Sequence, residues 1–392
     1  MKIMWFCIPA FGHTNPTIEV VRELCRRGHQ VFYYSFEMFR EKIEGAGAEF
    51  ISVESYLPSL DAMSEERIRN ASTTEMSVVS FEITAALDPF LAEEVKRISP
   101  DLVVSDSACF WGKLTAEKYH LPMVCSTTTF AFNQYSSKYT KYSLTELGDM
   151  VFGLPKVNRA LKKLEPLGYH VKSSLDLVQN KPDTDTIVYT SRTFQPCSET
   201  FDEAHYCFVG PSVKQVEPED KTGRRPFVYI SLGTVIVSHP EFYRHCFEAL
   251  KDEDIDVLIS CGTAFDRSSL GTPPEHISVE PYVNQMEVLA KSDLFLTHCG
   301  MNSASEGLYM GVPELLFPIT GEQQAVARRV KETGAGRMLE KHEANDPKTL
   351  RKVILEALND PALKEGAQAM RQDFLSCSGP SGAADFIESR IK

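Results

Sequence analysis

Short apolar runs alternate with longer amphipathic patterns along almost the whole chain, and this alternation constrains the fold more than any other feature. It is typical of a parallel sheet whose two faces are covered by helices. The sequence therefore predicts an α/β fold of the doubly wound type. The predicted strands cover residues 3–8, 30–35, 48–53, 101–105, 122–126 and 186–191, followed by 227–232, 256–260, 294–297 and 313–317.

A polar, charged segment without hydrophobic periodicity separates two such series of strands, at residues 213–226. Its composition is typical of a linker, and 392 residues are enough for two hydrophobic cores. We therefore expect two Rossmann-like domains facing a cleft, at residues 1–212 and 227–375, followed by a C-terminal helical segment at 376–392. Sheets of this kind bind ligands beyond the carboxyl ends of their strands, so the residues that follow each strand are the functional candidates.

Charge and cysteine usage exclude several classes of protein. A formal net charge of -13 opposes binding to nucleic acid, because that affinity comes largely from Lys and Arg. The ten cysteines form no CxxC or CxxH pair, which disfavours a zinc site and a disulfide framework. The apolar first residues precede no convincing cleavage site, and no later run has the roughly 18 apolar residues of a membrane span. The expectation is a cytoplasmic chain without a membrane span.

His13 is the first candidate for chemistry, because it follows the first predicted strand. Asn15 is suited to cap the next helix, Pro16 to its first turn and Gly28 to its end. An imidazole between a strand and a helix has an intrinsic pKa near neutrality and suits a general base. The alternative is an ordinary hydrogen-bonded loop histidine.

Asp106 lies at the mouth of another predicted strand, directly after residues 101–105, and is a candidate partner for His13. A carboxylate beside a histidine selects its tautomer and stabilises the imidazolium that forms when it takes a proton. Asp106 is equally suited to cap a helix that begins near Ser107, and both roles can hold together.

The aromatic residues of the segment 130–180 allow two interpretations, a packed insertion or a region that lines the acceptor site. These residues are Phe130, Phe132, Tyr135, Tyr139, Tyr142 and Phe152.

The segment from residue 294 to 313 carries the strongest local signal. A buried strand leads into a glycine-containing loop and then into a helix, so backbone N–H groups and the positive helix end form a natural phosphate site. His298, Asn302 and Ser303 would add donors. The alternative is that Ser303 and Glu306 form an ordinary capping box. That box would not require the preceding histidine or the later Gly-Val-Pro, so the longer pattern favours the phosphate site.

Residues 282–336 closely resemble the donor-binding signature of the inverting, nucleotide-sugar-dependent glycosyltransferases of the GT-B fold, especially their bacterial macrolide and flavonoid branch. The similarity extends over nearly the whole chain, through residues 12–17, 231–234 and 318–330. It implies that His13 is the base for the acceptor hydroxyl and that Asp106 holds it. It also implies that the tail packs back on the first domain.

The resemblance implies a donor site in the second domain. The diphosphate would meet the phosphate loop, the ribose would meet a glutamate, and the base would stack on an aromatic ring where many relatives have tryptophan. A glutamate stands where many relatives carry an aspartate for the sugar, which leaves the identity of sugar and base open. The implied donor residues are Thr234, Tyr282, Val283, Gln285, His298, Gly300, Asn302, Ser303, Glu306, Glu322 and Gln323.

The implied reaction is inverting transfer of a hexose, glucose from UDP-glucose, to a hydroxyl of a small hydrophobic acceptor such as a flavonoid, a macrolide or another phenolic natural product. A helix amino end can stabilise the leaving diphosphate, so no metal or other cofactor is expected. A sugar-nucleotide hydrolase or epimerase and a non-catalytic sugar-nucleotide-binding module stay open as alternatives. An NAD-dependent oxidoreductase is disfavoured, because the first loop has one glycine, Gly12, instead of G-x-G-x-x-G.

Overall fold

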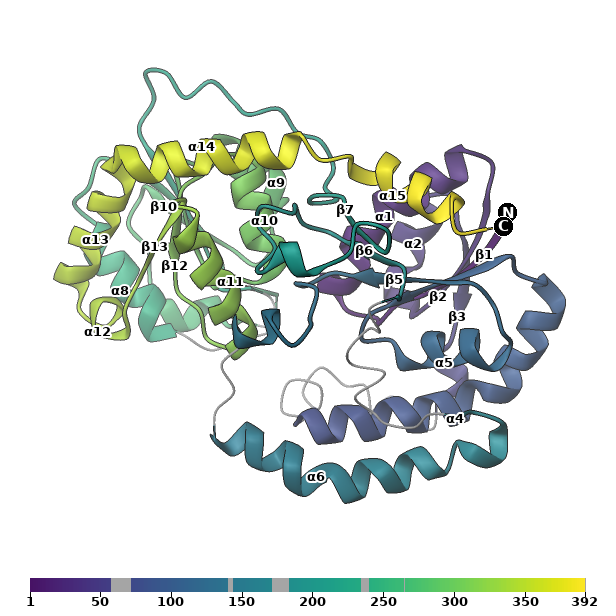
Figure 1. The fold of residues 1–392 in the computed structure, drawn as a ribbon. Helices are drawn as coiled ribbons and strands as arrows, with labels where there is room; N and C mark the ends of the chain where they lie inside the picture. The colour runs from purple at the N-terminus through teal and green to yellow at the C-terminus, as the bar shows by residue number, and fades with distance from the viewer. Residues whose placement is uncertain (58–71, 140–143, 171–182, 234–239, 264, 392) are drawn as a thin grey trace. The chain divides into compact units, whose positions relative to one another are not determined.

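The protein divides into two compact units, each with its own parallel sheet (Figure 1). A computed structural model describes residues 1–57, 72–139, 144–170, 183–233, 240–263 and 265–391. Unit 1 comprises Met1–Lys138, Tyr142–Val213 and Cys377–Lys392, and unit 2 comprises Tyr139–Lys141 and Lys214–Ser376. The predicted α/β fold with two doubly wound sheets is confirmed.

Unit 1 is built on a seven-stranded sheet in the order β3-β2-β1-β4-β5-β6-β7, in which the paired strands are parallel. The chain winds outward from β1 in one direction and then from β4 in the other, so the winding reverses between β1 and β4. The strands are β1 (Lys2–Phe6), β2 (Gln30–Ser35), β3 (Glu49–Ser52), β4 (Leu102–Asp106), β5 (Met123–Thr127), β6 (Thr186–Val188) and β7 (Tyr206–Phe208). The helices are α1 (Phe11–Arg26), α2 (Arg40–Glu44), α4 (Thr73–Ile98), α5 (Phe110–Lys118), α6 (Leu144–Lys162) and α15 (Gly379–Glu388).

Unit 2 repeats this winding in a six-stranded sheet of order β10-β9-β8-β11-β12-β13. The reversal here lies between β8 and β11. The strands are β8 (Phe227–Ser231), β9 (Asp256–Ser260), β10 (Ile277–Glu280), β11 (Leu294–Thr297), β12 (Glu314–Leu316) and β13 (Gly336–Met338). The helices are α8 (Pro240–Leu250), α9 (Gln285–Lys291), α10 (Met301–Tyr309), α11 (Gly321–Glu332), α12 (Lys341–Ala344), α13 (Pro347–Asn359) and α14 (Pro361–Leu375).

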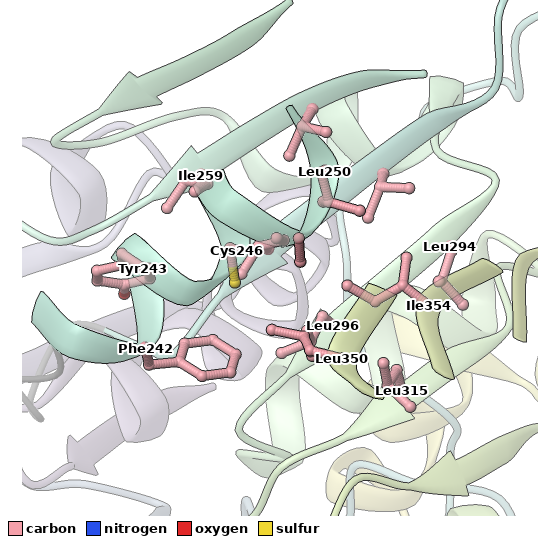
Figure 2. Packing of buried hydrophobic residues seen from close by; sticks show 14 of the residues in the cluster. Phe242, Tyr243, Cys246, Leu250, Ile259, Leu294, Leu296, Leu315, Leu350 and Ile354 are labelled. Atoms are coloured by element: carbon pink, nitrogen blue, oxygen red, sulfur yellow. The ribbon is translucent and has the colours of Figure 1, made fainter. Parts of the chain in front are cut away.

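The two faces of the unit 2 sheet carry different side chains, because successive residues of a strand point to opposite faces. One face packs against α8 and α13 in a hydrophobic core. On the other face, strand register places Tyr229, Phe295 and Glu314 in one row across β8, β11 and β12. The core residues labelled in Figure 2 are Phe242, Tyr243, Cys246, Leu250, Ile259, Leu294, Leu296, Leu315, Leu350 and Ile354.

The first helix begins earlier than the sequence predicts. Its N-cap is Ala10 and its first residue is Phe11, so the prediction that Asn15 caps this helix is wrong. The backbone N–H groups of His13 and Thr14 donate to the carbonyl of Ala10 at 3.0 and 2.8 Å, which closes a turn before Pro16 is reached. His13 therefore lies in the first turn of α1 and not in a preceding loop.

The C-terminal helix α15 belongs to unit 1, where it packs beside α1 (Figure 1). Arg27 at the end of α1 donates to Asp385 Oδ1 at 2.6 Å and to Glu388 Oε2 at 2.9 Å. Within the predicted C-terminal helical segment at 376–392, α15 begins at Gly379. Pro380 is compatible with this start, since proline needs no N–H partner in a first helical turn.

Three short strands escape the sequence prediction, namely β7, β10 and β13. Each has three or four residues and includes partly exposed positions, so hydrophobic periodicity has too few residues to mark them. Pairing with a neighbouring strand is what defines them.

Among the described residues, no helix is long and apolar enough to cross a membrane.

Candidate functional site

His13 and Asp106 form a hydrogen-bonded pair of side chains in unit 1. Phe6 of β1 lies in register with Ser105 of β4, so the residues that follow these strands emerge at one edge of the sheet. His13 Nδ1 lies 2.9 Å from Asp106 Oδ2. The Asp106 side chain is fully buried, whereas 25% of the His13 side chain is exposed. The pair stands where the winding reverses, the place at which such sheets bind ligands.

The Asp106 carboxylate decides which nitrogen of His13 carries the proton. An ionised carboxylate is an acceptor, so Nδ1 donates to it and Nε2 is the basic nitrogen of the neutral ring. Asp106 Oδ1 accepts a second hydrogen bond from the backbone N–H of Ala108 at 2.8 Å. The N-cap of the following helix α5 is Cys109, so the alternative in which Asp106 caps that helix is wrong. The carboxylate is held in a tight turn and faces the imidazole.

Thr128 is a neighbour of His13 that sequence reasoning missed. It follows β5, the strand next to β4, and its hydroxyl oxygen lies 3.2 Å from His13 Nδ1. The available signal was its position just after a predicted strand.

Two buried cysteines lie near Asp106. Burial and, to a lesser extent, the charge of Asp106 raise the pKa of the Cys7 and Cys109 thiols well above their usual value. Both thiols therefore stay uncharged beside the carboxylate.

In unit 2, His298 lies between two glycines at the carboxyl ends of β8 and β11. A Cβ added to Gly233 or to Gly300 would stand 2.7 Å from His298 Nε2, so the ring occupies space that side chains would otherwise fill. Burial lowers the pKa of His298 to about 4, against a smaller opposing effect of the Ser231 backbone. Its Nδ1 is buried and has no hydrogen-bond partner among the described residues. At neutral pH the ring is an uncharged polar group facing this loop.

The loop between β11 and α10 delivers a helix amino end to the same edge of the sheet. Cys299 adopts a φ of 65°, in the left-handed region, and Gly300 is the N-cap of α10. Because α10 starts at Met301, Ser303 lies inside the helix, and the capping-box interpretation of Ser303 and Glu306 is wrong. The amino end of α10 therefore presents backbone N–H groups and partial positive charge where an anion can bind.

Ser303 and Glu306 of α10 meet Gln285, the first residue of α9. Gln285 Nε2 donates to Glu306 Oε2 at 2.6 Å and to Ser303 Oγ at 3.3 Å. The Tyr229 hydroxyl donates to Gln285 Oε1 at 3.1 Å. Residues three apart on a helix share a face, which is why both α10 side chains reach one amide. The structure thus joins three predicted donor residues and adds Tyr229, which the sequence did not single out.

Two further predicted residues precede α9. Tyr282 is 71% exposed, so its ring is accessible for stacking, and Val283 is half-buried beside it. Asn302 is half-buried in the first turn of α10. The predicted phosphate contact Thr234 lies outside the described residues.

Glu322 and Gln323 begin α11, after β12. Glu322 is exposed. Gln323 Oε1 accepts from the backbone N–H groups of Ile319 and Thr320, and the Thr320 hydroxyl accepts from the Gln323 N–H. These contacts form a capping box, whose T-x-x-Q pattern is visible in the sequence. Because Oε1 of Gln323 accepts the hydrogen bonds of this cap, Nε2 is the side-chain atom of Gln323 that can contact a ligand.

Comparisons with known proteins identify the family. The model for the C-terminal domain of erythromycin biosynthesis protein CIII-like proteins matches residues 244–389. The protein named uncharacterized UDP-glucosyltransferase YojK, from Bacillus subtilis, is 33% identical over 100% of this chain and 98% of its own length. Demethyllactenocin mycarosyltransferase from Streptomyces fradiae is 30% identical over 99% of this chain and 86% of its own length.

A solved structure agrees with these relatives over the whole length. The calicheamicin glycosyltransferase CalG4 superposes with a TM-score of 0.83 at 28% identity, covering 100% of this chain and 98% of that one. The fold, the matched C-terminal domain and the full-length relatives all point to one family. The chain belongs to the nucleotide-sugar glycosyltransferases of the GT-B fold, in their bacterial macrolide and flavonoid branch.

Proposed function

We propose that this protein transfers glucose from UDP-glucose, with inversion at the sugar carbon, to a hydroxyl of a small hydrophobic acceptor. The observation that carries the proposal is the 2.9 Å hydrogen bond between His13 Nδ1 and Asp106 Oδ2 where the winding of the unit 1 sheet reverses. A buried carboxylate on one ring nitrogen makes the other nitrogen the base. That is what activation of an acceptor hydroxyl requires.

In the proposed reaction, His13 Nε2 removes the proton of the acceptor hydroxyl while the acceptor oxygen attacks the anomeric carbon. The new carbon–oxygen bond forms as the bond between that carbon and the diphosphate oxygen breaks, and the electron pair leaves with UDP. Attack opposite to the leaving group inverts the anomeric configuration. Asp106 balances the positive charge that His13 acquires, and the proton then passes to solvent.

The donor half of the proposal uses the amino end of α10. The departing diphosphate gains negative charge, which the backbone N–H groups and the dipole of this helix stabilise without a metal ion. His298 at its low pKa of about 4 contributes a neutral polar ring, so it does not bind the diphosphate as a cation. Glu306 would accept from the ribose hydroxyls, Tyr282 would stack on uracil, and Glu322 with Gln323 would contact the glucose.

Exposed aromatic rings of unit 1 support a hydrophobic acceptor. Phe11, two residues before His13, is 45% exposed, and Tyr135 and Phe152 are 47% and 85% exposed. An exposed aromatic ring offers apolar area on which a hydrophobic ligand can pack. Phe130 from the same aromatic segment is instead buried against Phe194, so part of that segment serves packing.

The test is product analysis by mass spectrometry, with UDP- and dTDP-sugars offered together with phenolic and macrolide acceptors. UDP-glucose with a phenolic or macrolide acceptor should give the acceptor plus one hexose and release UDP, with EDTA present or absent. Release of UDP and free glucose without any acceptor product would favour the hydrolase alternative. Faster transfer from a dTDP-sugar would overturn the donor assignment, and loss of activity in EDTA would overturn metal independence.

His13→Ala should lower transfer by about 10²- to 10⁴-fold while UDP still binds, because a general base contributes on that order. The chain offers a matched control in His205, whose Nδ1 lies 2.9 Å from Asp185 Oδ1. This second pair lies at the opposite, amino-terminal ends of β6 and β7. His205→Ala should retain parental transfer rates. Equal activity of His13→Ala and the parent would show that the base is misassigned.

A further inference from the structure

Tyr229 occupies the centre of the sheet beneath the donor residues. It is the third residue of β8, and strand register places it opposite Phe295 of β11, with ring centroids 4.8 Å apart and an interplanar angle of 9°. Its neighbours Val228 and Ile230 point to the other face, into the core shown in Figure 2. The stacked ring is fully buried, so the position of the Tyr229 hydroxyl is determined by the sheet.

That hydroxyl is hydrogen-bonded to the side chain that joins α9 to α10. It donates to Gln285 Oε1 at 3.1 Å, and Gln285 Nε2 donates to Glu306 Oε2 at 2.6 Å. A side-chain amide has one accepting end and one donating end, so a donor on Oε1 turns Nε2 toward the carboxylate. The contact of Nε2 with Ser303 Oγ at 3.3 Å agrees with this orientation.

We propose that Tyr229 is a positioning residue for the donor nucleotide: through Gln285 it fixes which way the Glu306 carboxylate faces and so makes the site select ribonucleotides over deoxyribonucleotides. The inference rests on the proposed function, in which Glu306 accepts from the ribose hydroxyls. Tyr229 itself touches no reacting atom. Its effect is transmitted by two hydrogen bonds within unit 2, from β8 to α9 and from α9 to α10.

The chemistry of Tyr229 suits a permanent donor. Burial raises the pKa of its phenol above the usual value, and the hydroxyls of Ser231 and Ser260 offset this effect in part. The phenol therefore keeps its proton at every pH at which the enzyme could work. Without the hydroxyl, Gln285 Oε1 loses its donor, and the contacts of Nε2 with Glu306 and Ser303 are left to orient the amide. An amide that flips would set its carbonyl oxygen against the Glu306 carboxylate. Two acceptors facing each other repel, which would displace Glu306 from the position that receives a ribose hydroxyl.

The test compares UDP with 2′-deoxy-UDP by calorimetry in the full-length protein. Tyr229→Phe keeps the stacked ring and removes one hydroxyl. It should weaken UDP binding on the order of fivefold, the effect of one lost hydrogen bond, while 2′-deoxy-UDP binding changes less than twofold. The donor KM should rise with kcat preserved at saturating donor. A purely structural role would weaken both nucleotides equally.

Gln285→Leu removes the middle of the relay and should collapse the same discrimination between the two nucleotides. Adding Tyr229→Phe to Gln285→Leu should produce no further loss, since the two residues act through one path. If Tyr229→Phe does not fold, Gln285→Leu alone decides, because intact discrimination in it would overturn the relay. The matched control is Tyr243→Phe, a buried tyrosine of α8 on the opposite sheet face, which should bind both nucleotides like the parent.

Failure of the relay and failure of the proposed function give different results. Suppose that the parent binds UDP. If Tyr229→Phe then weakens the binding of UDP and of 2′-deoxy-UDP equally, or weakens the binding of neither nucleotide, the inference is overturned and the proposed function is unaffected. If the parent binds UDP selectively but transfers no sugar, the proposed function is overturned and the relay is still measured. If the parent binds neither nucleotide, both are overturned.

Discussion

Glu314 is a carboxylic acid in the interior of the unit 2 sheet. It starts β12, its exposed fraction is 0%, and neither side-chain oxygen has a hydrogen-bond partner among the described residues. Oε1 lies 2.4 Å from where a Cβ on Gly307 of α10 would stand, so the carboxyl group fills the space left by that glycine. Burial raises the pKa of Glu314 well above its usual value. The folded protein therefore holds this acid protonated at pH values where an unfolded chain has lost the proton.

The sign of the pH dependence follows from this difference. Below about pH 4.3 both states carry the proton, and Glu314 has no pH-dependent effect. Above it the folded state retains a proton that the unfolded state has released, so the free energy of unfolding falls by about 1.4 kcal/mol per pH unit until the folded pKa is reached. Between pH 4.5 and 6 this amounts to about 2 kcal/mol. Glu314→Gln removes the titrating group and hence this loss.

The assay is urea unfolding of the parent and Glu314→Gln at pH 4.5 and pH 6. The difference in unfolding free energy, variant minus parent, should grow by about 2 kcal/mol over that interval. Far-UV circular dichroism follows both units, whereas tryptophan fluorescence follows unit 1 alone, because Trp5 and Trp111 both lie there. Glu365→Gln, on the exposed side of α14, should show no such growth. A change below about 0.5 kcal/mol in Glu314→Gln would refute the reasoning, since the carboxyl would then ionise as readily as in water.

Two further substitutions test the site. Asp106→Asn should lower kcat of transfer by about 10³-fold, because an amide no longer selects the His13 tautomer or balances its charge. Asp185→Asn is the matched control and should keep the parental kcat. An Asp106→Asn activity within threefold of the parent would contradict the role of Asp106. Gly300→Ala should raise the donor KM about tenfold, since its Cβ would stand 2.7 Å from His298 Nε2 and displace the ring. Gly148→Ala, where nothing lies within 4 Å of the added carbon, should leave donor KM unchanged, and an unchanged KM in Gly300→Ala would argue against the packed ring.

The sequence predicted well what depends on neighbours along the chain. The predicted strands at 30–35, 256–260 and 294–297 match β2, β9 and β11, because a buried run bounded by turn residues carries its own signal. The start of α1 was misplaced for a related reason. Asn15 and Pro16 are good signals for a helix start, but hydrogen bonds to Ala10 begin the helix one turn earlier.

The placement of His13 and Asp106 illustrates what the two sources of information each contribute. The sequence predicted that His13 follows one strand and that Asp106 lies at the carboxyl end of another. Their 2.9 Å contact depends on β1 and β4 being neighbours, although the two residues are 93 positions apart in the chain. Thr128 joins them from a third strand, and its role depends on the same pairing. Strand order is a property of the folded sheet, so a linear pattern could nominate these residues without joining them.

The sequence by itself determined the class of fold and the places where the longer buried strands lie, and it nominated candidate residues for a glycosyltransferase site. Tertiary structure alone decided that Tyr229 reaches Gln285, and that Glu314 is buried without a partner. The physical reason is that periodicity and turn chemistry act over a few residues, whereas hydrogen bonding and burial depend on which strands and helices meet. A tyrosine or a glutamate in a strand looks the same in sequence whether it faces solvent, a core or a ligand, and packing alone assigns it one of these environments.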